Sequence, residues 1–117
     1  NHGRYVEFLE EARWAFFDEQ PGLVKRLHCR DLTHAVVSLV VDYRHVARVG
    51  DELQIVTRVR EVGRPSVVMG QVVARRDGEI IVEAKVTNVF VDRDGRPATV
   101  TEDFRPLVVE EAHHGAR

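Results

Sequence analysis

The chain has 117 residues, a length that suits one domain with a core of its own. Hydrophobic residues make up 44% of the sequence, which excludes an intrinsically disordered protein. Lys and Arg together number 17 against 19 Asp and Glu, so the formal net charge is −2. This balance gives no electrostatic reason to expect nucleic acid or an anionic membrane as a partner.

Cysteine content and the length of the apolar stretches bear on location. Cys29 is the only cysteine, so no internal disulfide can form, and a reducing cytoplasm is the default compartment. A membrane span needs ~20 apolar residues in a row, and the apolar stretches of this chain are much shorter. We therefore expect a cytoplasmic protein with no membrane span.

The first predicted element is a long helix over residues 4–19. Its apolar residues recur at the helical period, and Pro21 with Gly22 ends the pattern. The stripe that we expect to face the core consists of Tyr5, Phe8, Leu9, Ala12, Ala15 and Phe16. Residues 1–5 form a polar lead-in that contains a glycine, and the helix behind it presents unpaired N–H groups at its positive end. Such an end can hold an anion or polarise a carbonyl oxygen.

Strand signals dominate the rest of the chain. Residues 23–33 have a mixed pattern that indicates a loop or a short strand. Alternating apolar residues then predict four strands, at residues 37–44, 53–60, 66–75 and 80–91. Asp77 and Gly78 are a strong hairpin signal between the last two. We expect a short edge strand at residues 97–101 and a frayed tail at residues 110–117.

The predicted architecture is α+β, an antiparallel β-sheet wrapped around one long helix. One helix cannot cover a sheet with long edge strands, and an uncovered edge invites unwanted pairing. Joining two sheets edge to edge removes that liability. We therefore expect a homodimer, or a dimer of dimers that forms a homotetramer.

Four segments carry a further signal. They read RYVEFLEEAR at residues 4–13, YRHVARVGD at 43–51, GRPSV at 63–67 and EAKVTNVFVD at 83–92. Together and in this order, they resemble the 4-hydroxybenzoyl-CoA thioesterase-like family of hotdog-fold acyl thioesterases. The resemblance covers residues 1–106 and implies a single hotdog domain over residues 1–117. It also implies hydrolysis of acyl thioesters at sites on a dimer interface.

The resemblance assigns roles to the first residues. The family's commonest opening, Asp-x-x-Gly-His-Val-Asn-Asn-Ala-Arg-Tyr, aligns its two asparagines with Asn1 and His2 and its alanine with Gly3. The backbone N–H groups of His2 and Gly3 are the candidate oxyanion donors, and Asn1 either orients water or substrate or caps the helix. The family's aspartate, a nucleophile or general base, falls before Asn1. We expect this catalytic loop, and an edge strand ahead of it, upstream of the given sequence.

Two glutamates are alternative carboxylates. A related hotdog thioesterase family uses a glutamate about two turns into this helix, a placement that matches Glu10 or Glu11. Glu11 borders the apolar stripe, where partial burial would tune it for work as a base, and Glu10 lies further around the helix. The competing interpretation is that both are solvated or structural, in a surface that also includes Arg13.

Arginines are the candidate ligands for the phosphates of coenzyme A, because the guanidinium binds phosphate through two parallel hydrogen bonds. Arg58, Arg60 and Arg64 lie on or next to the second predicted strand, and the resemblance places Arg64 and Ser66 where the family often contacts coenzyme A. A solvated strand face is the alternative. We expect no metal site and no resident cofactor, with coenzyme A or phosphopantetheine present only as part of the substrate.

The predicted function is therefore that of an acyl-CoA thioesterase, which releases a free acid and a thiol. Two alternatives stay open on the sequence. One is a thioesterase that acts on acyl carrier protein in a polyketide or fatty acid pathway. The other is a non-catalytic hotdog dimer that binds acyl groups.

Overall fold

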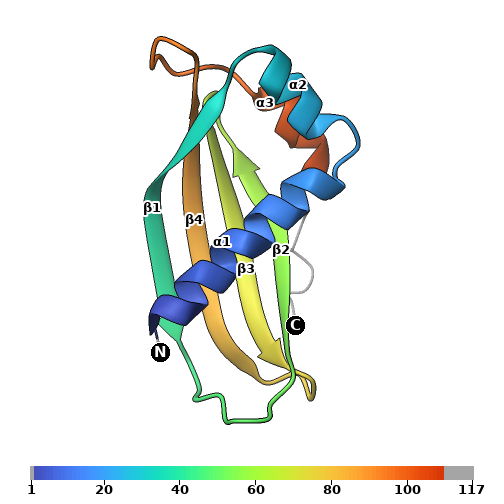
Figure 1. The fold of residues 1–117 in the computed structure, drawn as a ribbon, viewed down its shortest axis with the longest axis vertical. Coiled ribbons are helices and arrows are strands. Elements are labelled where there is room, and N and C mark those ends of the chain that lie inside the picture. Colours follow the sequence, from blue (N-terminus) through green and yellow to red (C-terminus); the bar gives the residue numbers. More distant parts are fainter. Residues whose placement is uncertain (1, 110–117) are drawn as a thin grey trace.

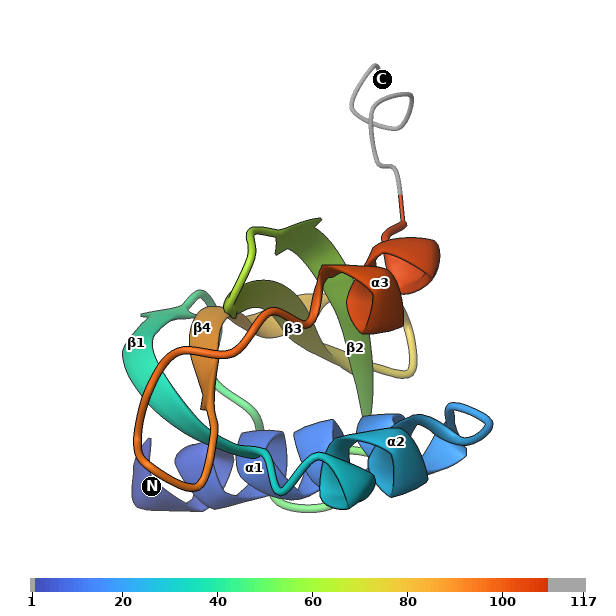
Figure 2. The same cartoon turned by 90° about the horizontal axis from the view of Figure 1, so that it is seen from above.

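The computed structural model describes residues 2–109; Asn1 and the predicted tail at residues 110–117 lie outside the described residues. One long helix crosses one face of a four-stranded antiparallel sheet (Figure 1). Viewed from above, the sheet curves over this helix (Figure 2). This arrangement confirms the predicted α+β class.

Helix α1, His2–Glu19, begins earlier than predicted, because His2 and Gly3 are helical and do not form a lead-in. Its buried residues are Leu9, Arg13 and Phe17, which are spaced one turn apart. The predicted stripe is therefore confirmed at Leu9 but displaced about the helix axis, since Tyr5, Ala12 and Phe16 are only half-buried and Ala15 is exposed. Phe8 belongs to that stripe but is exposed, and its ring lies 5.1 Å below the guanidinium carbon of Arg4.

A second helix, α2 (Leu23–Cys29), replaces the loop or short strand predicted there. It follows Gly22, which adopts a left-handed conformation with φ of 74°. Leu23 and Leu27 are buried one turn apart, and they pack into the same core as Phe17. Seven residues hold too few helical periods for the sequence pattern to show.

The four predicted strands are confirmed as β1 (Thr33–Tyr43), β2 (Leu53–Val62), β3 (Ser66–Arg75) and β4 (Ile80–Val91). Their order in the sheet is β1-β4-β3-β2, so β1 and β2 are the two edges within the described part of the chain. β1 begins before its predicted start, and a register shift interrupts its pairing with β4 between Val36 and Ser38.

The predicted edge strand at residues 97–101 is wrong except for one isolated bridge between Val91 and Pro97. Thr101 instead begins a short helix, α3 (Thr101–Phe104), which a 3₁₀ turn, η1 (Arg105–Leu107), continues. Phe104 is fully buried there, and its ring packs against Phe90 at 5.2 Å. This segment therefore closes one end of the core and does not extend the sheet.

Two hydrophobic clusters form the core, and polar residues lie between them. One cluster surrounds Phe17, and the other surrounds Leu9. Between these two residues on α1 lies Arg13, whose Nη1 donates to Oε1 of Gln71 on β3 at 3.0 Å. The Gln71 amide in turn donates to the carbonyl oxygen of Leu9 at 2.9 Å and to Oγ1 of Thr57 at 3.0 Å. Gln71 thus ties α1 to the inner strand β3 and to the edge strand β2.

Removing this acceptor tests its contribution to stability. The variant Gln71→Leu leaves the buried Arg13 guanidinium without its partner, and we expect a loss of about 3 kcal/mol in the free energy of unfolding. Urea unfolding followed by circular dichroism measures the change. The double variant Arg13→Met/Gln71→Leu should be more stable than Gln71→Leu alone, because no buried charge is then stranded. Losses that simply add would contradict this account.

Candidate active site

A cavity of about 410 Å³ lies between α1, α2 and the first half of β1. Most of its lining is apolar, which suits an acyl chain. The apolar residues are Trp14, Phe17, Val24, Leu27, Leu32, Val36 and Phe90, and the polar residues are Glu10, His28, Thr33 and His34.

His34 is the polar group most deeply set into this wall. Its ring contacts three aromatic rings, with centroid distances of 5.0 Å to Trp14, 5.6 Å to Phe17 and 5.4 Å to Phe90. Nε2 of His34 is buried and has no hydrogen-bond partner among the described residues. An unpaired buried polar atom is unusual in a folded protein and calls for an explanation.

The other ring nitrogen of His34 fixes its tautomer. Nδ1 lies 3.2 Å from Oδ1 of Asn88, whose amide nitrogen donates to the carbonyl oxygen of Val67 at 3.4 Å. Oδ1 is therefore an acceptor, so Nδ1 carries the proton and Nε2 presents a lone pair. Burial lowers the pKa of His34, against smaller opposing effects of the Asn88 hydrogen bond and the Glu10 carboxylate. The ring is therefore neutral at pH 7.

The start of α1 lies beside the far end of β1. The rings of Tyr5 and Tyr43, which is the last residue of β1, are 5.9 Å apart. The first N–H groups of any helix lack intrahelical partners, and in α1 these belong to the turn that begins at His2. The cavity is reached further along the same flank of α1, because Gly3 and Trp14 are separated by ~16 Å of helical rise.

The two candidate glutamates differ in their position relative to the cavity. Both are exposed, but Glu10 lines the cavity together with His34 and Glu11 does not. The expected partial burial of Glu11 is wrong, because Arg13 faces the sheet where the predicted stripe placed Ala12 and Ala15. A catalytic role for either glutamate stays a prediction.

The candidate phosphate ligands do not gather at the cavity. Arg58 and Arg60 flank Val59, which is buried against the core, so they project from the opposite face of the sheet. A Cβ atom on Gly70 would lie 2.7 Å from Cδ of Arg60, which shows that Arg60 lies across β3 on that face. Arg64 is exposed in the turn between β2 and β3, and Ser66 begins β3. Their role toward coenzyme A stays a prediction.

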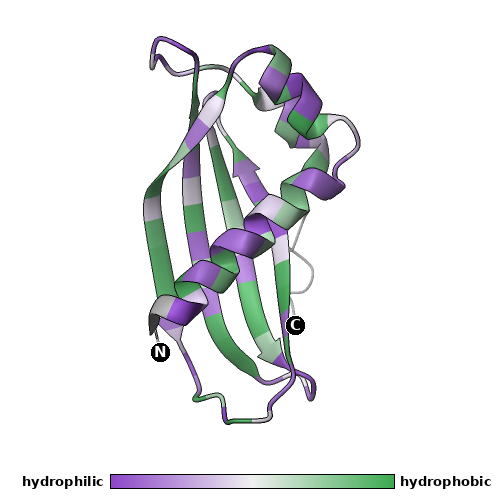
Figure 3. Cartoon of the chain, in the orientation of Figure 1, coloured by the Kyte–Doolittle hydropathy of each residue, from purple (hydrophilic) through white to green (hydrophobic). Residues whose placement is uncertain are grey.

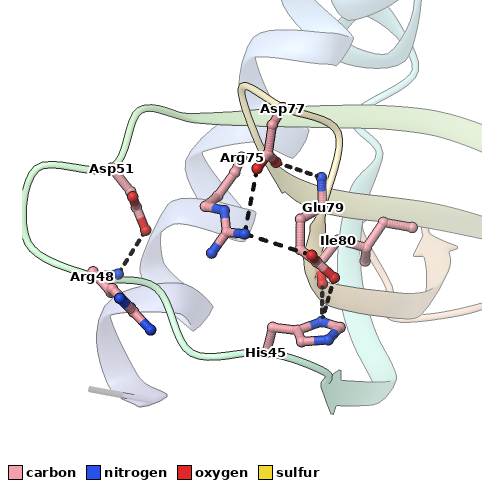
Figure 4. A network of polar contacts seen from close by, with 7 residues as sticks. All are labelled: His45, Arg48, Asp51, Arg75, Asp77, Glu79 and Ile80. Carbon is pink, nitrogen blue, oxygen red and sulfur yellow. Dashed lines mark hydrogen bonds and ion pairs between the residues drawn. The ribbon is translucent and has the colours of Figure 1, made fainter.

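A separate polar network joins the loop of residues 44–52 to the hairpin between β3 and β4 (Figure 4). Nδ1 of His45 lies 2.9 Å from the carbonyl oxygen of Ile80 and 3.1 Å from the Glu79 carboxylate. Nη2 of Arg75 lies 3.5 Å from the same carboxylate. His45 thus holds the loop in place. Within residues 2–109, no group of His, Cys, Asp and Glu is arranged to hold a metal ion, and no helix is long and apolar enough to cross a membrane.

Sequence reasoning missed the residues that shape the cavity. Trp14 and Phe17 fell outside the predicted stripe, and His34 falls before the start predicted for its strand. The alternation of residues along β1 could have placed His34 on the same face as Val36, because the two lie two residues apart. Its ring contacts and its unpaired nitrogen appear only when α1 is placed over β1.

Known proteins share this architecture. A family model of the thioesterase-like superfamily matches residues 1–108. The chain is 28% identical over 103 residues to the long-chain acyl-CoA thioesterase FadM of Escherichia coli strain K12, a match that covers 87% of this chain and 77% of that protein.

Two solved structures extend the likeness. YbaW, a probable thioesterase from Escherichia coli, superposes with a TM-score of 0.84 at 26% identity over 93% of this chain and 86% of that one. A thioesterase from Thermus thermophilus, complexed with coenzyme A and Zn, gives a TM-score of 0.73 at 27% identity over 98% of this chain and 80% of that one. The hotdog fold implied by the four sequence segments is thereby confirmed, and the chain belongs to the thioesterase-like superfamily.

Proposed function

We propose that this protein hydrolyses acyl-CoA thioesters to a free acid and the thiol of coenzyme A. One observation carries the proposal: the open end of α1 and a cavity with an apolar lining border the same edge strand, β1. Thioester hydrolysis needs a site for the oxyanion and a place for the acyl chain, and these two features supply them. The naming of FadM as an acyl-CoA thioesterase and the coenzyme A bound to the Thermus enzyme support this class of substrate.

The start of α1 stabilises the transition state. The backbone N–H groups of His2 and Gly3 donate to the carbonyl oxygen as it gains negative charge, and the helix dipole adds to their effect. One such donor is typically worth ~3 kcal/mol of the barrier. The arrangement depends on the backbone, so it does not require particular side chains at these two positions.

Of the residues of α1, Glu10 is the one that supplies the catalytic carboxylate. It is the acidic residue that borders the cavity, and it activates water for attack on the thioester carbonyl or attacks directly. Within one protomer it lies ~10 Å of helical rise beyond Gly3, too far to act at the same carbonyl. A second copy must therefore bring its Glu10 to the helix start of the first.

Edge strand β1 is the contact that brings the second copy into place. Val36, Val37, Leu39 and Val40 are all exposed although they are apolar, and they form a hydrophobic run along this strand that only Ser38 interrupts (Figure 3). These exposed apolar residues lie on both faces of β1, because Leu39 pairs with the buried Val86 and Val40 pairs with the exposed Lys85. Pairing β1 with its copy covers this run and satisfies the backbone groups of the edge.

Antiparallel pairing about a twofold axis also completes the site. The Tyr43 end of one β1 then lies opposite the Thr33 end of the other. Because α1 starts beside Tyr43 and the cavity lies beside Thr33, the helix start of each protomer meets the cavity and Glu10 of the second copy. We therefore propose a homodimer with two composite sites.

The two neighbouring glutamates of α1 give a matched test of catalysis. We expect Glu10→Gln to lower kcat/KM for acyl-CoA by about 100-fold or more, the usual contribution of a general base. Glu11→Gln should leave the rate within about twofold, since Glu11 is exposed and does not border the cavity. Release of thiol from a series of acyl-CoA esters measures both, with the same acyl groups on carrier protein as the comparison. Wild-type rates in Glu10→Gln would remove that residue from the mechanism, and no turnover by the wild type would overturn the function.

Two edge-strand variants test the dimer. Val40 on β1 and Val56 on β2 are equally exposed, at 53% and 55%. We expect Val40→Lys to give a monomer, because the twofold axis places two new charges close together. Val56→Lys should stay dimeric and active. Sedimentation velocity measures the mass, and hydrolysis should fall together with dimer content. A wild type at the 13.4-kDa mass of a single chain would refute the composite site.

A further inference from the structure

We propose that the cavity between α1, α2 and β1 selects acyl chains that carry a hydroxyl group, and that this hydroxyl donates a hydrogen bond to Nε2 of His34. The inference deepens the proposed function, on which it rests, by naming the class of acyl group. It starts from a single anomaly in the described residues, the buried nitrogen of His34 without a partner.

The geometry makes Nε2 an acceptor that is held in place. Asn88 is fully buried, and it fixes the His34 ring through Nδ1 on the side away from Nε2. A buried acceptor without a partner costs stability in every molecule that carries it. Phe or Leu at this position would remove the unpaired acceptor but would leave Oδ1 of the buried Asn88 without its donor. The histidine therefore pairs with Asn88 through one nitrogen and keeps an acceptor at the other, which points to a ligand that supplies a donor.

Water is a poor candidate for that donor. A buried water molecule needs two to four polar partners, roughly, to be stable. The three aromatic rings that pack against His34, those of Trp14, Phe17 and Phe90, offer no strong acceptor to such a water molecule. A hydroxyl attached to an acyl chain differs from water, because the chain gains by burial against the same rings while the hydroxyl completes one hydrogen bond.

The charge and polarity of the cavity lining limit the chemical class of the ligand further. An ionised group would lose its hydration among apolar side chains, and an anion would also meet the Glu10 carboxylate at the rim. An amide would bring a carbonyl oxygen that needs its own donor. A neutral alcohol on an aliphatic chain meets these limits with one polar atom.

Trp14 is the most exposed of the three rings that pack against His34. Of the three rings around His34, those of Phe17 and Phe90 are 2% exposed, whereas Trp14 is 50% exposed. A change of the Trp14 rotamer therefore uncovers His34 with the least loss of packing. Trp14 is also the only tryptophan in the chain, so its fluorescence reports directly on occupation of the cavity.

Binding of free acids tests the inference without relying on hydrolysis. The probes are dodecanoic acid and its 3-hydroxy and 12-hydroxy derivatives, titrated below their micellar concentrations and followed by Trp14 fluorescence and calorimetry. We expect at least one hydroxylated acid to bind the wild-type protein about tenfold more tightly than dodecanoic acid. His34→Phe should abolish this preference, because an aromatic ring is kept and the acceptor is lost. The double variant His34→Phe/Asn88→Leu, which leaves no buried amide without the donor that Nδ1 supplied, should abolish it as well. His28→Phe, at an exposed position that also lines the cavity, should retain it.

A second readout uses the wild-type protein alone. The ¹⁵N resonance of His34 Nε2 should shift when the preferred hydroxylated acid binds, and it should stay in place with dodecanoic acid. Equal affinities for all three acids, or a preference that survives His34→Phe, would overturn the inference. A preserved preference in a protein that hydrolyses no thioester would instead overturn the proposed function and leave the inference standing.

Discussion

The hydrogen bonds that link Arg13, Gln71 and the Leu9 carbonyl oxygen fix the position of α1 on the sheet. Burial of apolar side chains holds a helix against a sheet but tolerates many rotations about the helix axis, whereas a buried guanidinium with one acceptor tolerates few. The rotation that results places Glu10 and Trp14 at the cavity beside β1 and leaves Glu11 outside it. The same placement brings Tyr5, near the start of α1, against the end of β1. The start of α1 and the cavity therefore both depend on the contact between Arg13 and Gln71, which lies outside the candidate site.

Strand β1 connects the fold to the function. It forms one wall of the cavity through His34 and Val36, it ends beside the start of α1, and its outer edge is unpaired within the described residues. A strand that is apolar on both faces is typical of the interior of a sheet, and β1 acquires that environment only beside a second copy. In the proposed dimer the same pairing that covers β1 also joins the helix start of one chain to the cavity of the other. The site is then complete only when the dimer forms, so a change that weakens the dimer also removes the site.

The sequence predicted the fold class and all four strands, because alternation in strands depends on local pattern alone. It predicted α1 but not its rotation, since hydropathy counts arginine as a surface residue and Arg13 is buried by its bond to Gln71. α2 was missed because two buried leucines do not make a visible period. The arginines of β2 are candidate ligands in the sequence, yet alternation turns Arg58 and Arg60 to the face away from α1. The importance of His34 lies in its unpaired nitrogen, which arises from packing between distant segments that no local pattern encodes.

A crystal structure with a non-hydrolysable ketone analogue of an acyl-CoA, in which a methylene group replaces the sulfur, tests the central claim most directly. The account predicts a twofold dimer joined at β1, with the ketone oxygen about 3 Å from the N–H groups at the start of α1 in one chain. The acyl chain should fill the cavity lined by Trp14 and His34 in the other chain. An acyl chain bound on the opposite face of the sheet, beside Arg58 and Arg60, would contradict the account, as would a complete site within one chain.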